Sequence, residues 1–177
     1  MNDPERKEPQ IPPEVTRYLR GAGSENLQFD FLIGDWSVRA VRYKPDGSVL
    51  LEYNAKWSAR YLNDKRMVMD DFKALSPAGD EISSFVTLRT YAEVTRRWEI
   101  TGLAALQPAM NGEWFGEWKD GEMHMDASGK GPGGQIVRNQ IRFFNIEKQS
   151  FSWESSMSFD DGKTWVRSSS LIATRAP

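Results

Sequence analysis

Hydrophobic and polar residues alternate in short segments along most of the chain. The clearest example is FSWESSMSF (151–159), where serines and a glutamate occupy one face and the other carries Phe151, Trp153, Met157 and Phe159. A period of two residues is typical of β-strands with one buried and one polar face. About ten such segments, rich in Val, Ile, Thr and aromatic residues, follow one another from residue 34 onward, which predicts a fold built almost entirely of strands.

Turn-forming sequences separate these segments at intervals of eight to twelve residues. Asp-Gly pairs at 46–47, 120–121 and 161–162 supply the positive φ that tight hairpins require. The connections have hairpin length, and no helical pattern lies between the segments. Neighbouring strands are therefore expected to pair antiparallel.

An open sheet of about ten strands would leave two long unpaired edges, so we expect the sheet to close. Several segments alternate imperfectly; WSVRAVRY (36–43), for example, carries apolar and charged residues on both faces. This fits an interior that is partly a polar-lined cavity better than the dry core of a two-layer sandwich. We therefore predict an all-β fold, an antiparallel up-and-down barrel of about ten strands spanning about 34–175.

The N-terminal part has a different pattern. Residues 1–10 are charged and contain prolines, which predicts a disordered tail. A short helix is expected at about 12–20, because proline opens the segment, apolar residues form a stripe and Gly21 follows as a C-cap. Residues 11–177 are then expected to form a single domain.

Composition narrows the range of functions. The chain has 177 residues, with 23 basic and 25 acidic side chains mixed along it and a net charge of −2, so nothing favours nucleic acid or an anionic membrane surface. No apolar run is long enough to span a membrane, and the N-terminus lacks the apolar segment of a secretory signal. Cysteine is absent, which fits a cytoplasmic protein and excludes thiolate chemistry. With one histidine, His124, no metal site is expected.

Three motifs carry a resemblance to a known superfamily. Gly34-x-Trp36 after a short helix resembles the opening of the lipocalins and the wider calycins. The segments FDFLIGDW (29–36), LRTYAEVTRRWEI (88–100) and SFSWESSMSFDDGKTWVRSSSLIATR (150–175) are similar to a bacterial calycin-like family of unknown function, whose members open with F-x-F-L-x-G-x-W and close with D-G-G-K-T-W. Asp161 stands where that family has the first glycine of the closing turn. The resemblance implies a calycin-like barrel in which Trp36 plugs one end, and it transfers no catalytic residue.

Large apolar side chains on different strands suggest a ligand pocket. Aromatic rings and methionines line many sites for apolar small molecules, and arginine or histidine can supply a polar anchor. The alternative is that these side chains merely fill a wide barrel. The candidate ligand-binding residues are Trp36, Tyr53, Met69, Arg89, Tyr91, Trp98, Trp114, His124, Arg142 and Trp153.

His124 is also the candidate catalytic residue. On a strand it shares a face with Glu122 and Asp126, and a nearby carboxylate could orient its ring as a general base. The alternative is a solvent-exposed face, with Met123 and Met125 as the buried partners. Some calycin-like barrels of the nitrobindin type bind heme through a histidine on a late strand. The last segment here (165–175) has none, so we expect no heme and no other cofactor.

Three functions remain open from the sequence. The first is binding of a small apolar or aromatic metabolite in the barrel. The second is a cofactor-free isomerase, cyclase or lyase that acts on a hydrophobic molecule in the same cavity, with His124 or an inward acid moving the proton. The third is a protein-interaction module with a solid barrel. A homodimer is left open as an alternative to a monomer.

Overall fold

The computed structural model describes residues 10–105, 113–131 and 133–177. The predicted disordered tail therefore lies outside the described residues, apart from Gln10. A helix, α1 (Pro13–Leu19), and two short 3-10 helices, η1 (Ser24–Leu27) and η2 (Asp30–Leu32), precede the strands. The ten strands are β1 (Gly34–Tyr43), β2 (Val49–Leu62), β3 (Met67–Leu75), β4 (Glu81–Ala92), β5 (Arg97–Ala104), β6 (Trp114–Lys119), β7 (Glu122–Lys130), β8 (Ile136–Phe144), β9 (Ser150–Ser158) and β10 (Val166–Arg175).

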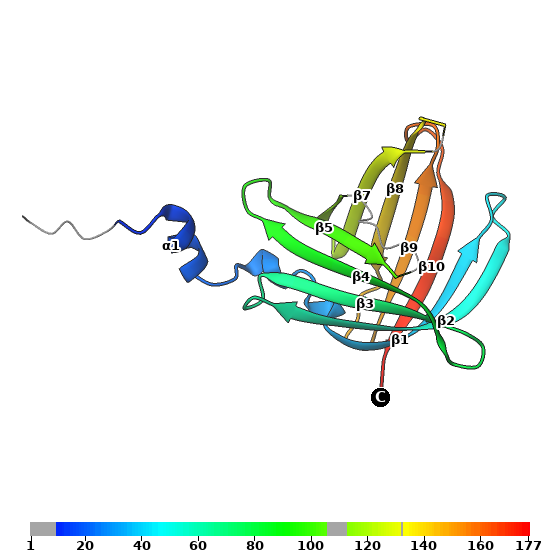
Figure 1. Ribbon diagram of the computed structural model, residues 1–177, viewed down its shortest axis with the longest axis horizontal. Coiled ribbons are helices and arrows are strands. Elements are labelled where there is room, and N and C mark those ends of the chain that lie inside the picture. Colours follow the sequence, from blue (N-terminus) through cyan, green and yellow to red (C-terminus); the bar gives the residue numbers. More distant parts are fainter. Residues whose placement is uncertain (1–9, 106–112, 132) are drawn as a thin grey trace, which may run out of the picture.

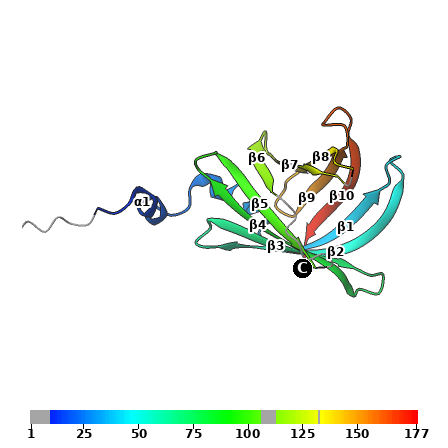
Figure 2. The ribbon, with the colours of Figure 1, turned by 45° about the horizontal axis from the view of Figure 1, so that its top comes forward.

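The strands form a closed antiparallel barrel in which each strand pairs with the next along the chain. The first and last strands close it, with a register that runs from Trp36↔Arg175 to Arg42↔Ser169. The narrowest contact joins β5 to β6, where the paired positions run only from Trp98↔Gly116 to Ile100↔Trp114. The curved strands and the closing pair, red beside blue, can be followed in Figure 1 and from a second side in Figure 2. The predicted all-β, up-and-down barrel with a short N-terminal helix is confirmed.

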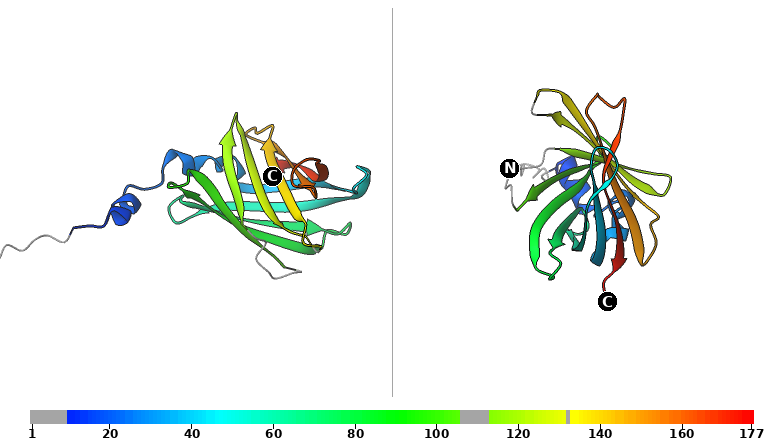
Figure 3. Two further views of the ribbon diagram at one scale, coloured as in Figure 1. Left: turned by 90° about the horizontal axis from the view of Figure 1, so that it is seen from above. Right: turned by 90° about the vertical axis from the view of Figure 1, so that its right-hand side faces the viewer.

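The segment between α1 and β1 covers one end of the barrel, which we call the floor. Phe29 and Leu32 are fully buried there, and the Phe29 ring centre lies 4.8 Å from that of Trp98 in an edge-to-face contact. No residue of α1 is buried, and the helix projects away from the barrel in Figure 1. In the right-hand view of Figure 3 the blue N-terminal segment is seen through the ring of strands, at the far end. One end of the barrel is thus filled by the chain itself.

The Gly34-x-Trp36 motif has a structural explanation at this floor. Gly34 has φ +117°, and a methyl group in its place would lie 2.3 Å from Nη1 of Arg175. The Arg175 guanidinium lies 3.8 Å above the Trp36 ring and donates a hydrogen bond to the carbonyl of Ile33. The Trp36 indole donates to the carbonyl of Leu32 at 2.7 Å. Trp36 is 1 % exposed, so it is a packed residue whose polar atom is satisfied.

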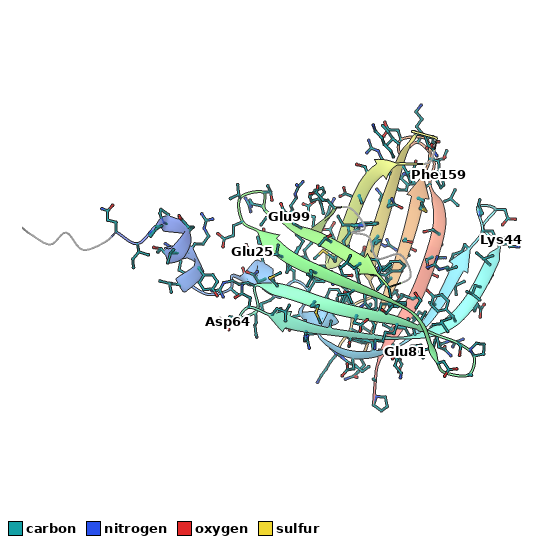
Figure 4. All side chains as sticks on the ribbon, viewed as in Figure 1. Glu25, Lys44, Asp64, Glu81, Glu99 and Phe159 are labelled. Carbon is teal, nitrogen blue, oxygen red and sulfur yellow. The ribbon has the colours of Figure 1, made fainter. Side chains whose placement is uncertain are left out.

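The opposite end, which we call the mouth, is formed by the hairpins that join β1 to β2, β3 to β4 and β9 to β10. In Figure 4, Lys44, Glu81 and Phe159 mark these hairpins, while Glu25 and Asp64 mark the floor end. The fully buried side chains concentrate near the floor, and include Trp36, Trp98, Phe143 and Phe151. The half of the barrel nearer the mouth is where a site can form.

Candidate ligand-binding site

A cavity of about 1050 Å³ occupies the barrel on the mouth side of the floor. Residues of the hairpin between β3 and β4, such as Ser76 and Pro77, and the exposed Ile82 surround its opening. Ligand pockets typically measure roughly 300–1000 Å³. The cavity is therefore large enough to enclose a molecule of several rings.

Aromatic residues cover much of the wall because neighbouring strands place them at paired positions. Trp57 on β2 pairs with Phe72 on β3, and Phe72 pairs with Phe85 on β4. On the other side, Phe143 of β8 pairs with Trp153 of β9. The ring centres of Trp57 and Phe72 are 5.5 Å apart in an edge-to-face arrangement. The remaining apolar lining is supplied by Tyr53, Ile100, Trp114, Met125, Ile141, Met157 and Leu171, among others.

A short polar strip interrupts this wall on β9 and β10. The pairing of these strands shifts between Arg167 and Ser169, so Ser168 is an extra residue in a β-bulge. Ser155, Ser168 and Ser169 all line the cavity as a result. The hydroxyls of Ser155 and Ser168 are 2.6 Å apart, and Ser169 donates to the carbonyl of Val41. Hydrogen bonds within the protein therefore already engage these hydroxyls.

A buried ion pair lies on β3 and β4. Asp70 is 1 % exposed and Arg89 is 3 % exposed, and both line the cavity. The Arg89 Nη1 donates to the Asp70 carboxylate. The Arg89 guanidinium also lies 4.9 Å above the ring of Phe29, so it contacts the floor as well. A buried charge needs such a partner, because an unpaired one would be strongly destabilising.

Two lining residues carry hydrogen-bond donors without a partner among the described residues. These are the Nε1 of Trp57 and the Nε of Arg89. Most buried polar groups in proteins are paired, and leaving a donor unpaired costs free energy. Each of these nitrogens can pair only with an acceptor atom, and both are covered by neighbouring side chains.

Four of the ten candidate residues line the cavity. They are Tyr53, Arg89, Trp114 and Trp153, which come from β2, β4, β6 and β9. They share an inward orientation and lie on the mouth side of the floor.

Three other candidates point inward but do not line the cavity. Trp36 packs at the floor, with its ring centre 4.7 Å from that of Phe151. Trp98 is fully buried and donates from its indole nitrogen to Gln28 at 2.9 Å. The Tyr91 ring contacts that of Trp98 at 5.8 Å. The floor occupies the space beside these rings.

The last three candidates, Met69, His124 and Arg142, do not line the cavity. Met69 lies between two buried inward residues, and its sulfur is 3.9 Å from the Nη2 of the exposed Arg60. His124 and Arg142 are cross-strand partners on β7 and β8, with side chains 46 % and 40 % exposed.

The partners of His124 and Arg142 explain this outward position. The His124 Nε2 is 3.3 Å from Glu122, and the Arg142 Nη2 is 3.1 Å from Glu154. Because Met123 and Met125 occupy the inner face of β7, His124 lies outside, as the alternative interpretation of this segment had it. The structure thus places Met69, His124 and Arg142 outside the lining of the cavity.

The sequence interpretation missed several lining residues, above all Trp57. It lies between two alanines that are also buried, Ala55 and Ala59, in the segment AKWSA (55–59). That alternation is a readable signal for an inward tryptophan. The pairing of Asp70 with Arg89, by contrast, has no local signal, because the two residues are 19 positions apart.

No protein-family model matches the chain, and no curated protein matches it in sequence. Solved structures do match its fold. Rv2717c from M. tuberculosis aligns with a TM-score of 0.58 at 14% identity, covering 88% of this chain and 99% of its own. The S-type phycobiliprotein lyase CPES from Guillardia theta aligns with a TM-score of 0.57 at 12% identity, covering 88% and 99%.

At these identities the likeness shows the fold alone. The fold is a calycin-like barrel, as the motifs implied. Membership of the bacterial family that opens with F-x-F-L-x-G-x-W stays a prediction.

Within residues 10–105, 113–131 and 133–177, no three acidic or histidine side chains gather where they could hold a metal ion. In the same part of the chain, no helix is long and apolar enough to cross a membrane.

Proposed function

We propose that this protein binds a small, mostly apolar or aromatic molecule inside the barrel. The observation that carries the proposal is the cavity of about 1050 Å³, open at the mouth and walled by aromatic side chains. A protein with no internal ligand has little reason to keep such a volume empty, since interiors are normally close-packed. The fold by itself does not decide the function, so the proposal rests on the cavity.

A solid interaction module fits this barrel poorly, because its interior is hollow. A cofactor-free enzyme would need a proton-transfer group at the cavity. Among the described lining residues the carboxylates are Asp70, which is bonded to Arg89, and Glu52, which is exposed. His124 lies on the outer face. Binding is therefore the function that these contacts support best.

Blocking the mouth tests the proposal. Ala74 lines the cavity on β3, between Ala55 of β2 and Ser83 of β4. In Ala74→Trp, an indole ring would occupy the space in which a ligand lies. Ile172 on β10 is 58% exposed and does not line the cavity, so Ile172→Trp is the matched control.

The probe is N-phenylnaphthylamine, an uncharged dye that fluoresces in apolar surroundings. We expect it to bind the wild type and Ile172→Trp at one molecule per chain with equal affinity. Because the indole of Ala74→Trp takes up this space, binding of the dye to that variant should weaken by at least about tenfold, which corresponds to about 1.4 kcal/mol. Equal affinity in all three proteins would place the dye outside the barrel and contradict the proposal.

A further inference from the structure

The charged residues that line the cavity cancel one another. Among the described residues these are Arg42, Glu52, Asp70 and Arg89. Arg42 and Glu52 are exposed, on neighbouring strands β1 and β2, and oppose each other in charge. Asp70 and Arg89 form the buried pair. The described lining therefore offers a ligand no net charge, although it contains two arginines.

Two polar atoms of this lining are buried and have no partner among the described residues, and both are donors. Trp57 Nε1 and Arg89 Nε are buried and unpaired among the described residues. Their surroundings are aromatic: the Trp57 ring centre lies 5.5 Å from those of both Phe72 and Phe151, and Arg89 lies over Phe29. An indole N–H cannot accept a hydrogen bond, and neither can a guanidinium. Only an acceptor atom can pair with them, and a ligand that supplies one must insert it between these rings, because both nitrogens are covered.

We propose that the ligand is uncharged where it meets β2, β3 and β4, and that it presents a hydrogen-bond acceptor there, such as the carbonyl oxygen of a ketone, an amide or a lactam. This inference rests on the proposed function and narrows its ligand class. A carboxylate in that position would bring a second negative charge next to Asp70, with Arg89 already neutralised, and burying an uncompensated charge is costly. A purely apolar group would leave both donors unpaired.

Three probes of nearly the same shape separate these cases. Acetylnaphthalene carries a neutral acceptor, ethylnaphthalene lacks it, and naphthoate carries a negative charge, all at the same ring position. Their affinities are measured by displacement of N-phenylnaphthylamine. We expect acetylnaphthalene to bind at least about tenfold more tightly than the other two. A cavity without usable donors would instead prefer ethylnaphthalene, which is the most apolar of the three.

Two substitutions assign the effect to the named residues. Trp57→Phe keeps an aromatic ring and removes the indole donor, so it should reduce the preference for acetylnaphthalene over ethylnaphthalene severalfold. Asp70→Asn removes the charge that neutralises Arg89, so naphthoate should bind about tenfold more tightly to this variant, while ethylnaphthalene is unaffected. Asp71→Asn is the matched control. Asp71 follows Asp70 on β3 but does not line the cavity, and its carboxylate lies 3.8 Å from the amino group of Lys73.

The outcomes distinguish this inference from the proposed function. If all three probes displace the dye but ethylnaphthalene binds most tightly, and Asp70→Asn leaves naphthoate unchanged, the inference is wrong and the binding function stands. If naphthoate binds most tightly to the wild type, Arg89 acts as an anion receptor and the inference is also wrong. If neither the dye nor any probe binds the wild type, both proposals fail. Circular dichroism of each variant confirms that it is folded, and Trp57→Phe tests the donor without changing any charge.

Discussion

Replacing Arg89 by methionine should destabilise the protein far more than an ordinary arginine substitution. The change removes the cation that neutralises Asp70, a residue that is only 1% exposed. Breaking a buried ion pair from one side typically costs about 3–5 kcal/mol, because the remaining charge is left uncompensated. Since both residues also line the cavity, where water can enter, we expect the lower end, about 3 kcal/mol.

The double variant Asp70→Leu/Arg89→Met makes the prediction more specific. It removes both charges together, so no uncompensated charge remains. Exchanging a buried pair for apolar residues is often neutral or stabilising. The double variant should therefore be more stable than Arg89→Met alone, by about 2 kcal/mol or more. That result would show that the pair is not needed for stability, and it would support the inference that the pair selects the ligand.

Urea unfolding measures these free energies, provided that the slope of the transition stays the same across the variants. The control is Arg138→Met, because Arg138 contacts Asp161 at 2.6 Å while both side chains are about half exposed, at 50% and 52%. An exposed ion pair contributes about 0–1 kcal/mol. The reasoning is refuted if Arg89→Met costs no more than Arg138→Met, or if the cost of the double variant equals the sum of its two single variants.

Three further predictions concern the floor, a hairpin and the outer face. Gly34→Ala should lower the free energy of unfolding by about 1–3 kcal/mol, since it combines a positive φ with a 2.3 Å approach to Arg175. Gly47→Ala should lower it less, because no atom lies within 4 Å of the added methyl group. Thermal unfolding compares the two variants, and equal losses of stability would show that the approach to Arg175 does not matter. The backbone N–H and then the hydroxyl of Thr164 lower the pKa of Asp160 from 3.8 to about 2. Because this folded-state pKa is depressed, the stabilisation from Asp160 is complete above its ordinary value and is lost as the pH falls through about 2; an NMR titration of its carboxyl carbon with a midpoint near 3.8 would contradict this. His124→Ala should leave the affinity for N-phenylnaphthylamine unchanged, because His124 is outside the cavity lining, and a loss of affinity in the dye titration would show that it contributes to the site.

The barrel could be predicted from the sequence because its signals are local. Asp-Gly turns and alternation with a period of two define hairpins. A sheet of about ten strands joined by hairpins has two unpaired edges unless it closes into a barrel. The inward face of β7 was also readable, since Met123 and Met125 enclose His124. In such segments the apolar neighbours decide which way the polar residue points.

The site was harder to predict because its determinants are not local. On β3 the carboxylate of Asp70 points inward and Met69 outward, the reverse of what the hydropathy of these two residues indicates, and Arg89 on the next strand pairs with the buried charge. The β-bulge at Ser168 turns two consecutive serines, Ser168 and Ser169, toward the cavity. The run of three serines in the sequence gives no sign of this bulge. Trp98 and Trp153 both point inward, but the N-terminal segment covers one and leaves the other at the cavity.

The most direct test of a ligand-binding barrel is a crystal structure of the protein with acetylnaphthalene. We expect the ring system inside the cavity, among Trp57, Trp114 and Trp153, with its oxygen within hydrogen-bond distance of the Trp57 indole or the Arg89 guanidinium. A ring bound only on the outer surface of the barrel, with the cavity closed by its own side chains, would contradict the account.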